Sequence, residues 1–386
     1  MPSLFLTSAN KGKRIVFWTL FCIALSQPAL SIYLDKRQLE MRDPLYGYRL
    51  HHLRQQLAES LHSPLFLIMG SSRVKYSVWP DAMNVHSAGD APQPIVYNFG
   101  MNGMGTIREL MHLRRLLADG IRPQWLLLEV WPPLWAEDGF FRESRMVLGE
   151  DDLHWRDLLL LGRYFRNDRD VLRVALQKSL TPIRTYRDSL LALFMQSLLT
   201  SEKLREMQQR VGDCLPADRG GWFPLPWETT TAEGTRGAVL DGEDKIKPLL
   251  QPVCIDPRSD AALRELLTEC RQRDIKVALI LIPEPSWTRG WYTPHTHAVI
   301  RDYLTRLGQD YPVPIVDARA WVSDDDFSDS THMRKKGVPA FSERLGREVV
   351  QPLIENRPLS NRVLFAGRAE GRPDVRSHAE RGKEGF

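Results

Sequence analysis

The sequence has little excess charge of either sign, and no internal repeat is visible in it. Its 52 basic and 48 acidic residues give a formal net charge of +4 over 386 residues. These charges are interspersed rather than gathered into a basic stripe, which argues against a nucleic-acid partner. With 43% hydrophobic residues, the chain is long and apolar enough to bury a sizeable core in one elaborated domain or two smaller ones.

Cysteine is also scarce. The four cysteines are Cys22, Cys214, Cys254 and Cys270. Cys214 and Cys254 bracket a loop-rich stretch, and they are the pair to test for a disulfide if the domain is extracytoplasmic. No Cys/His cluster has the short spacing of a zinc site, and no segment has the glycines and lysine of a phosphate-binding loop. We therefore expect no metal and no other cofactor.

The N-terminus carries the only long hydrophobic run. Residues 15–34 contain no charged side chain and follow Lys11, Lys13 and Arg14. About 20 apolar residues suffice to cross a bilayer, and preceding basic residues favour a cytoplasmic N-terminus. Residues 1–40 therefore form a predicted membrane anchor, with the rest of the chain extracytoplasmic, on the periplasmic or outer face. A cleaved signal peptide is the alternative, since Ala24–Ser26 loosely resembles a cleavage site.

Beyond the anchor, five short apolar runs are typical of buried parallel strands. They are residues 64–70, 94–100, 123–130, 275–283 and 313–318. Stretches with helical periodicity, such as 106–120 and 260–274, separate most of them. Strands that alternate with helices predict an α/β domain with a doubly wound parallel sheet over residues 41–357.

Two segments depart from this alternation. Residues 151–255 contain segments with helical periodicity followed by a loop rich in Trp, Gly and Pro, which predicts an insertion between the third and fourth strands. Such an insertion would overhang the carboxyl ends of the strands, where Trp222 and Trp227 either form a lid or pin a long loop. Residues 358–386 are polar and rich in arginine, and predict a disordered tail.

Candidate catalytic residues follow the first and last strands. Ser72 comes directly after the first strand, at an expected helix N-terminus that suits either a cap or a nucleophile. After the fifth strand, Asp329 and His332 are three residues apart, a spacing that lets the carboxylate hold one imidazole nitrogen while the other faces a nucleophile. Asn102 and Gly103 follow the second strand, where a glycine N–H and an amide can stabilise an oxyanion.

In this order, the segments GSSR, NFGMNG and DSTH resemble the blocks of the SGNH, or GDSL-like, hydrolase superfamily. The resemblance covers roughly residues 60–150 and 256–355. It implies a flavodoxin-like sheet and a Ser-His-Asp triad, with Ser72 as nucleophile and His332 and Asp329 as its partners. It also implies an oxyanion hole formed by the N–H groups of Ser72 and Gly103.

One block differs from the family pattern. After the third strand the family usually has a Gly-x-Asn-Asp segment whose Asn completes the oxyanion hole, whereas this chain reads LLLEVWPP. Asn102 substitutes for that Asn, or the hole keeps two backbone donors. Arg73, beside the serine, either binds substrate or pairs with Glu129 across the first and third strands.

The architecture is most similar to membrane-anchored SGNH-like proteins of the bacterial cell envelope, of the alginate O-acetyltransferase and D-alanyl-transfer types. The resemblance implies an acylated polysaccharide or glycan as substrate and a multi-pass membrane acyltransferase as a possible partner. After the fourth strand, Arg289 is placed to clamp an anionic group, and Trp291 and Tyr292 to stack on sugar rings. Alternatively, this aromatic loop holds the lid.

We therefore expect a serine-dependent acyl esterase or O-acyltransferase. The competing hypothesis is a noncatalytic SGNH-like module that binds glycan or forms part of a membrane-associated complex. The missing third-block Asn favours this second hypothesis, and the intact Ser72, Asp329 and His332 oppose it.

Overall fold

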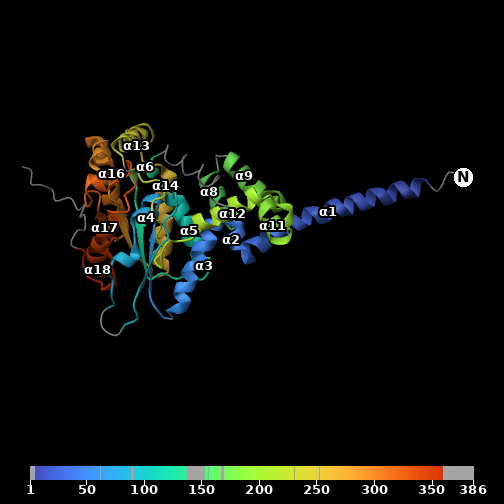
Figure 1. Cartoon of the computed structure of the whole chain (residues 1–386), viewed down its shortest axis with the longest axis horizontal. Helices are drawn as coiled ribbons and strands as arrows, with labels where there is room; N and C mark the ends of the chain where they lie inside the picture. Colours follow the sequence, from blue (N-terminus) through green and yellow to red (C-terminus); the bar gives the residue numbers. More distant parts are fainter. Residues whose placement is uncertain are drawn as a thin grey trace, which may run out of the picture.

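The computed structural model of the chain combines a layered α/β body with one long helix that projects from it (Figure 1). It describes residues 5–60, 62–87, 91–136, 153–154, 156–166, 169–229, 231–251 and 253–359. Nearly all of the predicted tail, 358–386, lies outside the described residues.

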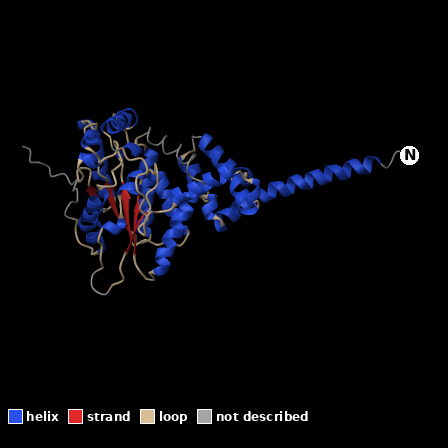
Figure 2. Ribbon diagram, viewed as in Figure 1, coloured by secondary structure: helices blue, strands red, loops and turns tan. Residues whose placement is uncertain are grey.

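Among the described residues, five strands form one parallel sheet in the order β2-β1-β3-β4-β5 (Figure 2). They are β1 (Leu65–Met69), β2 (Ile95–Asn98), β3 (Trp125–Glu129), β4 (Lys276–Leu281) and β5 (Ile315–Asp317). Each lies inside a run that the sequence predicts as a strand. The predicted α/β class and parallel sheet are therefore confirmed, and the continuous apolar runs reflect burial on both faces.

Helices cover both faces of the sheet, and the alternation of side chains along β1 shows how. Leu65, Leu67 and Met69 enter one core, whereas Phe66 and Ile68 enter the other. The first core is closed by α3 (Pro44–Glu59), α5 (Thr106–Ala118), α14 (Pro257–Gln272) and α16 (Pro294–Asp310). The second is closed by α4 (Ser72–Ser77) and α17 (Val338–Leu345).

Local sequence sets where the helices begin. Asp43 caps α3 by accepting the N–H of Tyr46 at 3.1 Å, and Pro44 occupies the first helical position. Asp256 caps α14 in the same way, through the N–H of Arg258 at 2.7 Å. A side-chain acceptor followed by proline is a strong signal for a helix start. The acceptor binds an N–H of the first turn, and the N–H that proline lacks would have no partner within the helix at that position.

The strand order places a crevice beside β1. The chain passes from β1 to β2 on one side and then crosses back to β3 on the other, so loops from both sides diverge at the carboxyl end of β1. In open parallel α/β sheets, ligands bind at this reversal of strand order. Ser72 follows β1 directly and therefore lies at this point.

The insertion between β3 and β4 divides into two parts. Its first part contains α8 (Asp157–Tyr164), α9 (Arg169–Leu180), α10 (Pro182–Thr185), α11 (Arg187–Phe194) and α12 (Ser201–Cys214). In Figure 1 the labels of α9, α11 and α12 gather where α1 joins the body, whereas α13 (Ala232–Lys245) lies over the α/β domain. The sequence predicted an overhang for the whole insertion, and only its second part lies near the strand ends that carry the candidate site.

The remaining elements are short. They are α2 (Leu39–Arg42), α6 (Pro132–Trp135), α15 (Ser286–Arg289), α18 (Gln351–Ile354), the 3₁₀ helices η1 (Pro80–Ala82), η2 (Gln196–Leu198), η3 (Lys247–Leu250) and η4 (Asp324–Asp326), and the π-helix η5 (Gly346–Val350). A buried arginine joins three of the longer helices. Arg115 of α5 contacts Asp43, before α3, at 2.7 Å and Asp157 of α8 at 2.5 Å.

The N-terminal helix α1 (Phe5–Arg37) contains the apolar run. Its residues Lys11–Arg37 have a mean hydropathy of 1.8 at their most apolar, and they are long and apolar enough to cross a membrane. Most of this segment is exposed in the chain itself, unlike the core helix of a globular domain.

The four cysteines all lie in described residues and are free thiols. Cys214 and Cys254 are therefore not joined in this structure. Burial raises the pKa of the Cys214 thiol to about 11, which keeps it protonated and unreactive at neutral pH.

Candidate active site

The serine turn is built by close packing at the end of β1. Gly70 has no room for a side chain, because a Cβ there would lie 2.5 Å from Cβ of Glu129. Ser71 is the cap of α4, and its hydroxyl accepts the N–H of Arg73 at 3.2 Å. The capping role that the sequence left open for Ser72 thus belongs to its neighbour, and Ser72 is the first residue of the helix.

The segment that carries Asp329 and His332 is a tight bend in the loop between β5 and α17. Oδ1 of Asp329 accepts the backbone N–H groups of Thr331 and His332, each at 2.7 Å. A bridge between Phe327 and Met333 closes the bend, and the N–H of Ser328 donates to the carbonyl of His332 at 2.9 Å. These contacts fix the backbone of the bend, which sets the position from which the His332 side chain projects.

The bend brings three side chains into one chain of hydrogen bonds. Oδ2 of Asp329 lies 2.8 Å from Nδ1 of His332, and Nε2 of His332 lies 2.8 Å from Oγ of Ser72. With the proton of the neutral ring on Nδ1, toward the carboxylate, Nε2 presents its lone pair to the serine hydroxyl. A hydroxyl, an imidazole base and an orienting carboxylate in this sequence are the arrangement that activates a serine nucleophile.

Asp329 is held in its ionised form. Burial alone would raise its pKa, but hydrogen bonds from the His332 ring and from the N–H groups of Thr331 and His332 outweigh this and lower the pKa to about 2. The carboxylate therefore stays charged throughout the neutral range, where it can stabilise an imidazolium beside it.

Asn102 and Gly103 lie in the loop after β2, and Tyr76 links Asn102 to the His332 ring. The N–H of Met101 donates to the carbonyl of Gly70 at 2.9 Å, which sets the loop after β2 alongside the serine turn. Oδ1 of Asn102 accepts the hydroxyl of Tyr76 at 3.1 Å. Gly103 has a φ of 58°, a left-handed conformation that glycine adopts without strain.

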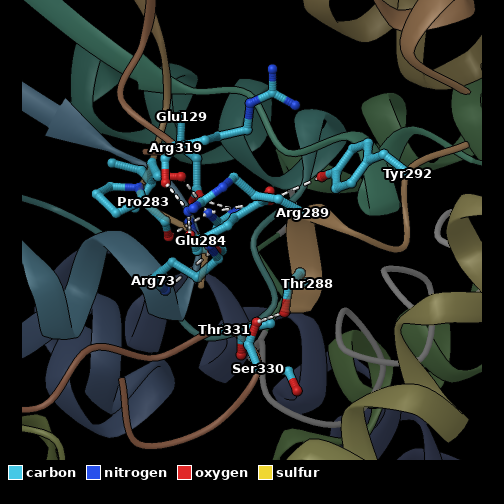
Figure 3. Close-up of polar contacts among 12 residues, drawn as sticks. Arg73, Glu129, Pro283, Glu284, Thr288, Arg289, Tyr292, Arg319, Ser330 and Thr331 are labelled. Atoms are coloured by element: carbon cyan, nitrogen blue, oxygen red, sulfur yellow. Dashed lines mark hydrogen bonds and ion pairs between the residues drawn. The ribbon is translucent and has the colours of Figure 1, made fainter. Parts of the chain in front are cut away.

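Glu129, at the end of β3, stands where the family pattern has its third block. Its Oε2 accepts the N–H of Ser71 at 2.6 Å, and its Oε1 lies 3.4 Å from the guanidinium of Arg73. Of the two alternatives for Arg73, the structure therefore shows the pairing with Glu129. Arg73 is buried and also contacts Glu284 at 3.6 Å (Figure 3). Its guanidinium lies 4.9 Å from the ring centroid of Trp131.

The side chains after β4 belong to the same buried network. The guanidinium of Arg289 donates to the carbonyls of Glu284 and Arg319, and the hydroxyl of Tyr292 donates to Glu284 at 2.9 Å (Figure 3). Burial raises the pKa of Glu284 despite the nearby arginines.

Both rings proposed for sugar stacking are buried. Trp291 is 6% exposed and Tyr292 is 5% exposed. The faces of both rings pack inside the protein, and the guanidinium groups of Arg73 and Arg289 are bonded to other groups of the protein. We therefore assign none of these four residues to substrate binding.

Two other aromatic rings lie against His332. Those of Tyr76 and Trp227 stand edge-on to the imidazole, with centroids at 5.9 and 5.5 Å. Tyr76 was not among the residues singled out from the sequence, although its position one helical turn after Ser72 places both on one face of α4. Trp227 is 48% exposed, so it brings an open aromatic surface to the histidine.

Trp222, the other tryptophan of the insertion, is a pin. Its ring stacks on Trp79 with centroids 4.9 Å apart, and its indole N–H donates to the carbonyl of Tyr76 at 2.9 Å. It is buried. Of the two alternatives for Trp222, a lid or a residue that pins a long loop, the structure shows the second. The loop that Trp222 fixes also contains Trp227, which lies at the site.

A cleft of about 580 Å³ opens beside the histidine. One wall is the bend that contains Asp329 and His332, and Trp227 stands at its edge. The opposite wall is α13, whose residues here are mostly small. They are Gly234, Gly237, Ala238, Asp241, Gly242, Lys245 and, just beyond the helix, Ile246. A drug-sized or disaccharide-sized ligand fits such a volume.

No protein-family model matches the chain, and none of the curated proteins compared with it is similar to it.

Proposed function

We propose that the protein is a serine-dependent acyl esterase or O-acyltransferase of the SGNH type. The observation that carries this proposal is the continuous hydrogen-bonded chain from Ser72 through His332 to Asp329. The strand order 2-1-3-4-5 supports it, because this order is that of flavodoxin-like sheets, in which ligands bind beside the first strand.

In the first half-reaction, Oγ of Ser72 attacks the carbonyl carbon of an acyl ester while Nε2 of His332 takes the hydroxyl proton. The C–O bond to the leaving alcohol then breaks, and the imidazolium returns that proton to the departing oxygen. Asp329 stabilises the imidazolium and holds its orientation. The product is an acyl ester of Ser72 and a free alcohol.

In the second half-reaction, His332 removes a proton from water or from a sugar hydroxyl as that oxygen attacks the carbonyl carbon of the acyl-serine. The bond from that carbon to Oγ of Ser72 then breaks, and the imidazolium returns the proton to Oγ, which restores the serine hydroxyl and the neutral imidazole. Water as acceptor makes the protein an esterase, and a sugar hydroxyl makes it an O-acyltransferase. Trp227 beside the cleft supports a sugar acceptor, because an exposed indole offers a face on which a sugar ring can stack.

The developing oxyanion is bound by the N–H groups of Ser72 and Gly103 and by Nδ2 of Asn102. The contact from Tyr76 to Oδ1 of Asn102 supports this role, since it fixes the amide with its Nδ2 as the remaining donor. Asn102 would then replace the Asn that the third block lacks.

The proposed setting is the outer face of a cell membrane. Helix α1 anchors the domain, and Lys11, Lys13 and Arg14 hold the N-terminal end in the cytoplasm. The substrate class is an acylated envelope polysaccharide or glycan, and a multi-pass membrane acyltransferase is a candidate partner.

Labelling with a fluorophosphonate serine probe tests the proposal on the full chain in detergent micelles. The wild type should label, and Ser72→Ala and His332→Ala should not. Ser71→Ala is the matched control: it removes the adjacent hydroxyl, which only caps α4, and should keep most of the labelling. If the folded wild type does not label, the noncatalytic glycan-binding or scaffold module is the better hypothesis, and glycan affinity becomes the quantity to measure.

A further inference from the structure

An unusual amount of apolar surface is exposed on the part of the insertion that contacts α1. It lies on α9, α10, α11 and the residues just after them. We call it the α9–α11 apolar face. It is formed by Leu180, Ile183, Leu193, Phe194, Met195 and Leu198. Single exposed apolar residues are common, whereas six large ones within 19 consecutive residues, on a segment that contacts a helix long enough to cross a membrane, indicate an interaction surface.

Helix α11 is the clearest element of this face. Its sequence is RDSLLALF, and none of its residues is buried. Phe194, at its end, is 73% exposed. A helix of a water-soluble body normally buries its apolar side against a core. In the described part of the chain, Leu190 and Leu191 of α11 are half-buried, whereas Leu193 and Phe194 remain exposed and would be stabilised by another apolar environment.

The α9 and α10 part of the face lies against α1. The N–H of Ile183 in α10 donates to Oε1 of Gln27 in α1 at 3.4 Å. Ser31 and Leu34 of α1 are fully buried, and Asp35 pairs with Arg42 of α2 at 2.8 Å. The C-terminal quarter of α1 is thus packed into the folded body, while residues 15–25 present their apolar side chains outward.

The rise of an α-helix gives the depth of this contact. The uncharged run 15–34 is about 30 Å long, which matches the hydrocarbon thickness of a bilayer. Gln27 lies roughly 10 Å inside the C-terminal end of that run. The N-terminal end of α10, bonded to Gln27, then lies about 10 Å below the headgroup boundary, which is the deep end of the range of about 5–10 Å for helices that lie in a membrane interface.

The charges beside the face suit the same location. Residues 169–187 contain five basic side chains and one acidic side chain. Arg184 of α10 and Arg187, the first residue of α11, are exposed, and Arg187 pairs with Asp188 at 3.1 Å. Basic residues next to an apolar helical face are typical of elements that lie in a membrane interface and contact anionic headgroups.

We propose that the α9–α11 apolar face inserts into the lipid leaflet at the C-terminal end of α1. The protein would then hold the membrane by a spanning helix and by an interfacial helical platform packed against it. Lipid is the favoured occupant because α10, which carries part of the face, is bonded to α1 within its uncharged run, and because basic residues lie next to the face in the sequence. The platform fixes the height and tilt of the α/β domain above the membrane. This inference rests on α1 crossing a bilayer and is independent of the triad.

Three single-cysteine variants of the full chain test it, each with the other native cysteines replaced by alanine and each carrying a nitroxide label. Native Cys22 reports on the span of α1, and Phe194→Cys reports on the face. Leu240→Cys is the matched control, because Leu240 is 55% exposed on α13, beside the cleft. Accessibility to oxygen and to a water-soluble nickel chelate is measured in vesicles of phosphatidylcholine and phosphatidylglycerol.

The proposal expects the label at position 194 to behave like that at Cys22, with high oxygen and low nickel accessibility, and the label at 240 to show the reverse. If 194 behaves like 240 while Cys22 is shielded from nickel, lipid does not cover the face and the proposal is overturned. A protein partner would then be the occupant to seek. If Cys22 itself is accessible to nickel, α1 does not span the bilayer and the proposal fails with its premise. None of these outcomes bears on serine labelling.

Discussion

Nε2 of His332 lies 2.8 Å from Oγ of Ser72, although 260 residues separate them in the chain. The contact forms because β1 and β5 are parallel strands of one sheet, so the loops that follow them emerge at the same edge. Ser72 begins the helix after β1, and His332 lies in the bend after β5. Because the proposed chemistry depends on this contact, substitutions of single residues can test it.

Replacing the orienting carboxylate should disable the base without disturbing the fold. Asp329→Asn keeps an oxygen for the N–H groups of Thr331 and His332, but its amide favours the wrong tautomer of the imidazole. By comparison with triads in general, we expect kcat on a chromogenic acyl ester to fall about 10⁴-fold. Circular dichroism should show an unchanged spectrum. A loss of less than tenfold would mean that the carboxylate does not orient a catalytic base.

The lowered pKa of Asp329 also predicts a dependence of stability on pH. Its pKa is about 2 in the folded chain and about 3.9 in an unfolded chain. A lowered pKa stabilises the fold above the unfolded value, and this contribution is lost as pH falls toward the folded value. The side chain is 20% exposed, so the contribution approaches about 2 kcal/mol.

Urea unfolding in detergent micelles measures this contribution. The difference in the free energy of unfolding between wild type and Asp329→Asn should be largest near neutral pH and should shrink steadily at acid pH. Ser72→Ala, which leaves the carboxylate and its hydrogen bonds in place, is the control and should differ from wild type by the same amount at both extremes. A difference for Asp329→Asn that does not change with pH would contradict the assignment.

Glu129 should act as a positioning residue for the serine turn. Glu129→Gln keeps an acceptor for the N–H of Ser71 but loses the charge beside Arg73, and Glu129→Ala loses both. Both variants lose one partner of a buried ion pair, which costs about 3–5 kcal/mol. The alanine variant should be the less stable of the two, because it also leaves the buried N–H of Ser71 without its acceptor. Where both variants fold, kcat should fall more for alanine than for glutamine, with KM nearly unchanged. Equal kcat values in the two would mean that the contact with Ser71 does not position the nucleophile.

The two tryptophans of the insertion should separate stability from substrate binding. Trp222→Ala leaves a cavity against Trp79 and should cost about 3 kcal/mol of stability. Trp227→Ala removes a half-exposed ring from the edge of the cleft and should change stability little, while raising KM for a glycan acceptor more than KM for a small ester. Thermal unfolding and kinetics with both substrates measure these effects. An equal rise in KM for the two substrates would argue against sugar stacking on Trp227.

Asn102 should contribute to the oxyanion hole. Losing one donor of such a hole typically lowers kcat by about 10² to 10³, and we expect this for Asn102→Ala. Tyr76→Phe removes only the hydroxyl that orients the amide, so its effect on kcat should be smaller and in the same direction. Single-turnover acylation of the serine measures both. An unchanged acylation rate in Asn102→Ala would leave only the backbone donors.

Local sequence signals were enough for the strands and for the serine, histidine and aspartate that the structure brings together. The strands are continuous apolar runs bounded by turns, and the positions of Ser72 and of Asp329 with His332 follow from the order of those runs. Tyr76 was accessible in principle from the periodicity of α4. The sequence placed Trp227 only in a loop that either forms a lid or is pinned to the surface. The sequence of a loop does not show which part of the protein the loop packs against.

The sequence by itself determined the α/β class, the parallel sheet, the apolar N-terminal helix and which polar residues follow each strand, because these depend on periodicity and on contacts between near neighbours in the chain. Only the tertiary structure decided that Arg73, Trp291 and Tyr292 are buried, that Glu129 holds the serine turn, and that the insertion divides between the cleft and α1. These properties depend on which surfaces meet when distant segments pack. Whether a side chain is buried or paired with an opposite charge depends on the neighbours that this packing brings to it, and not on its residue type alone.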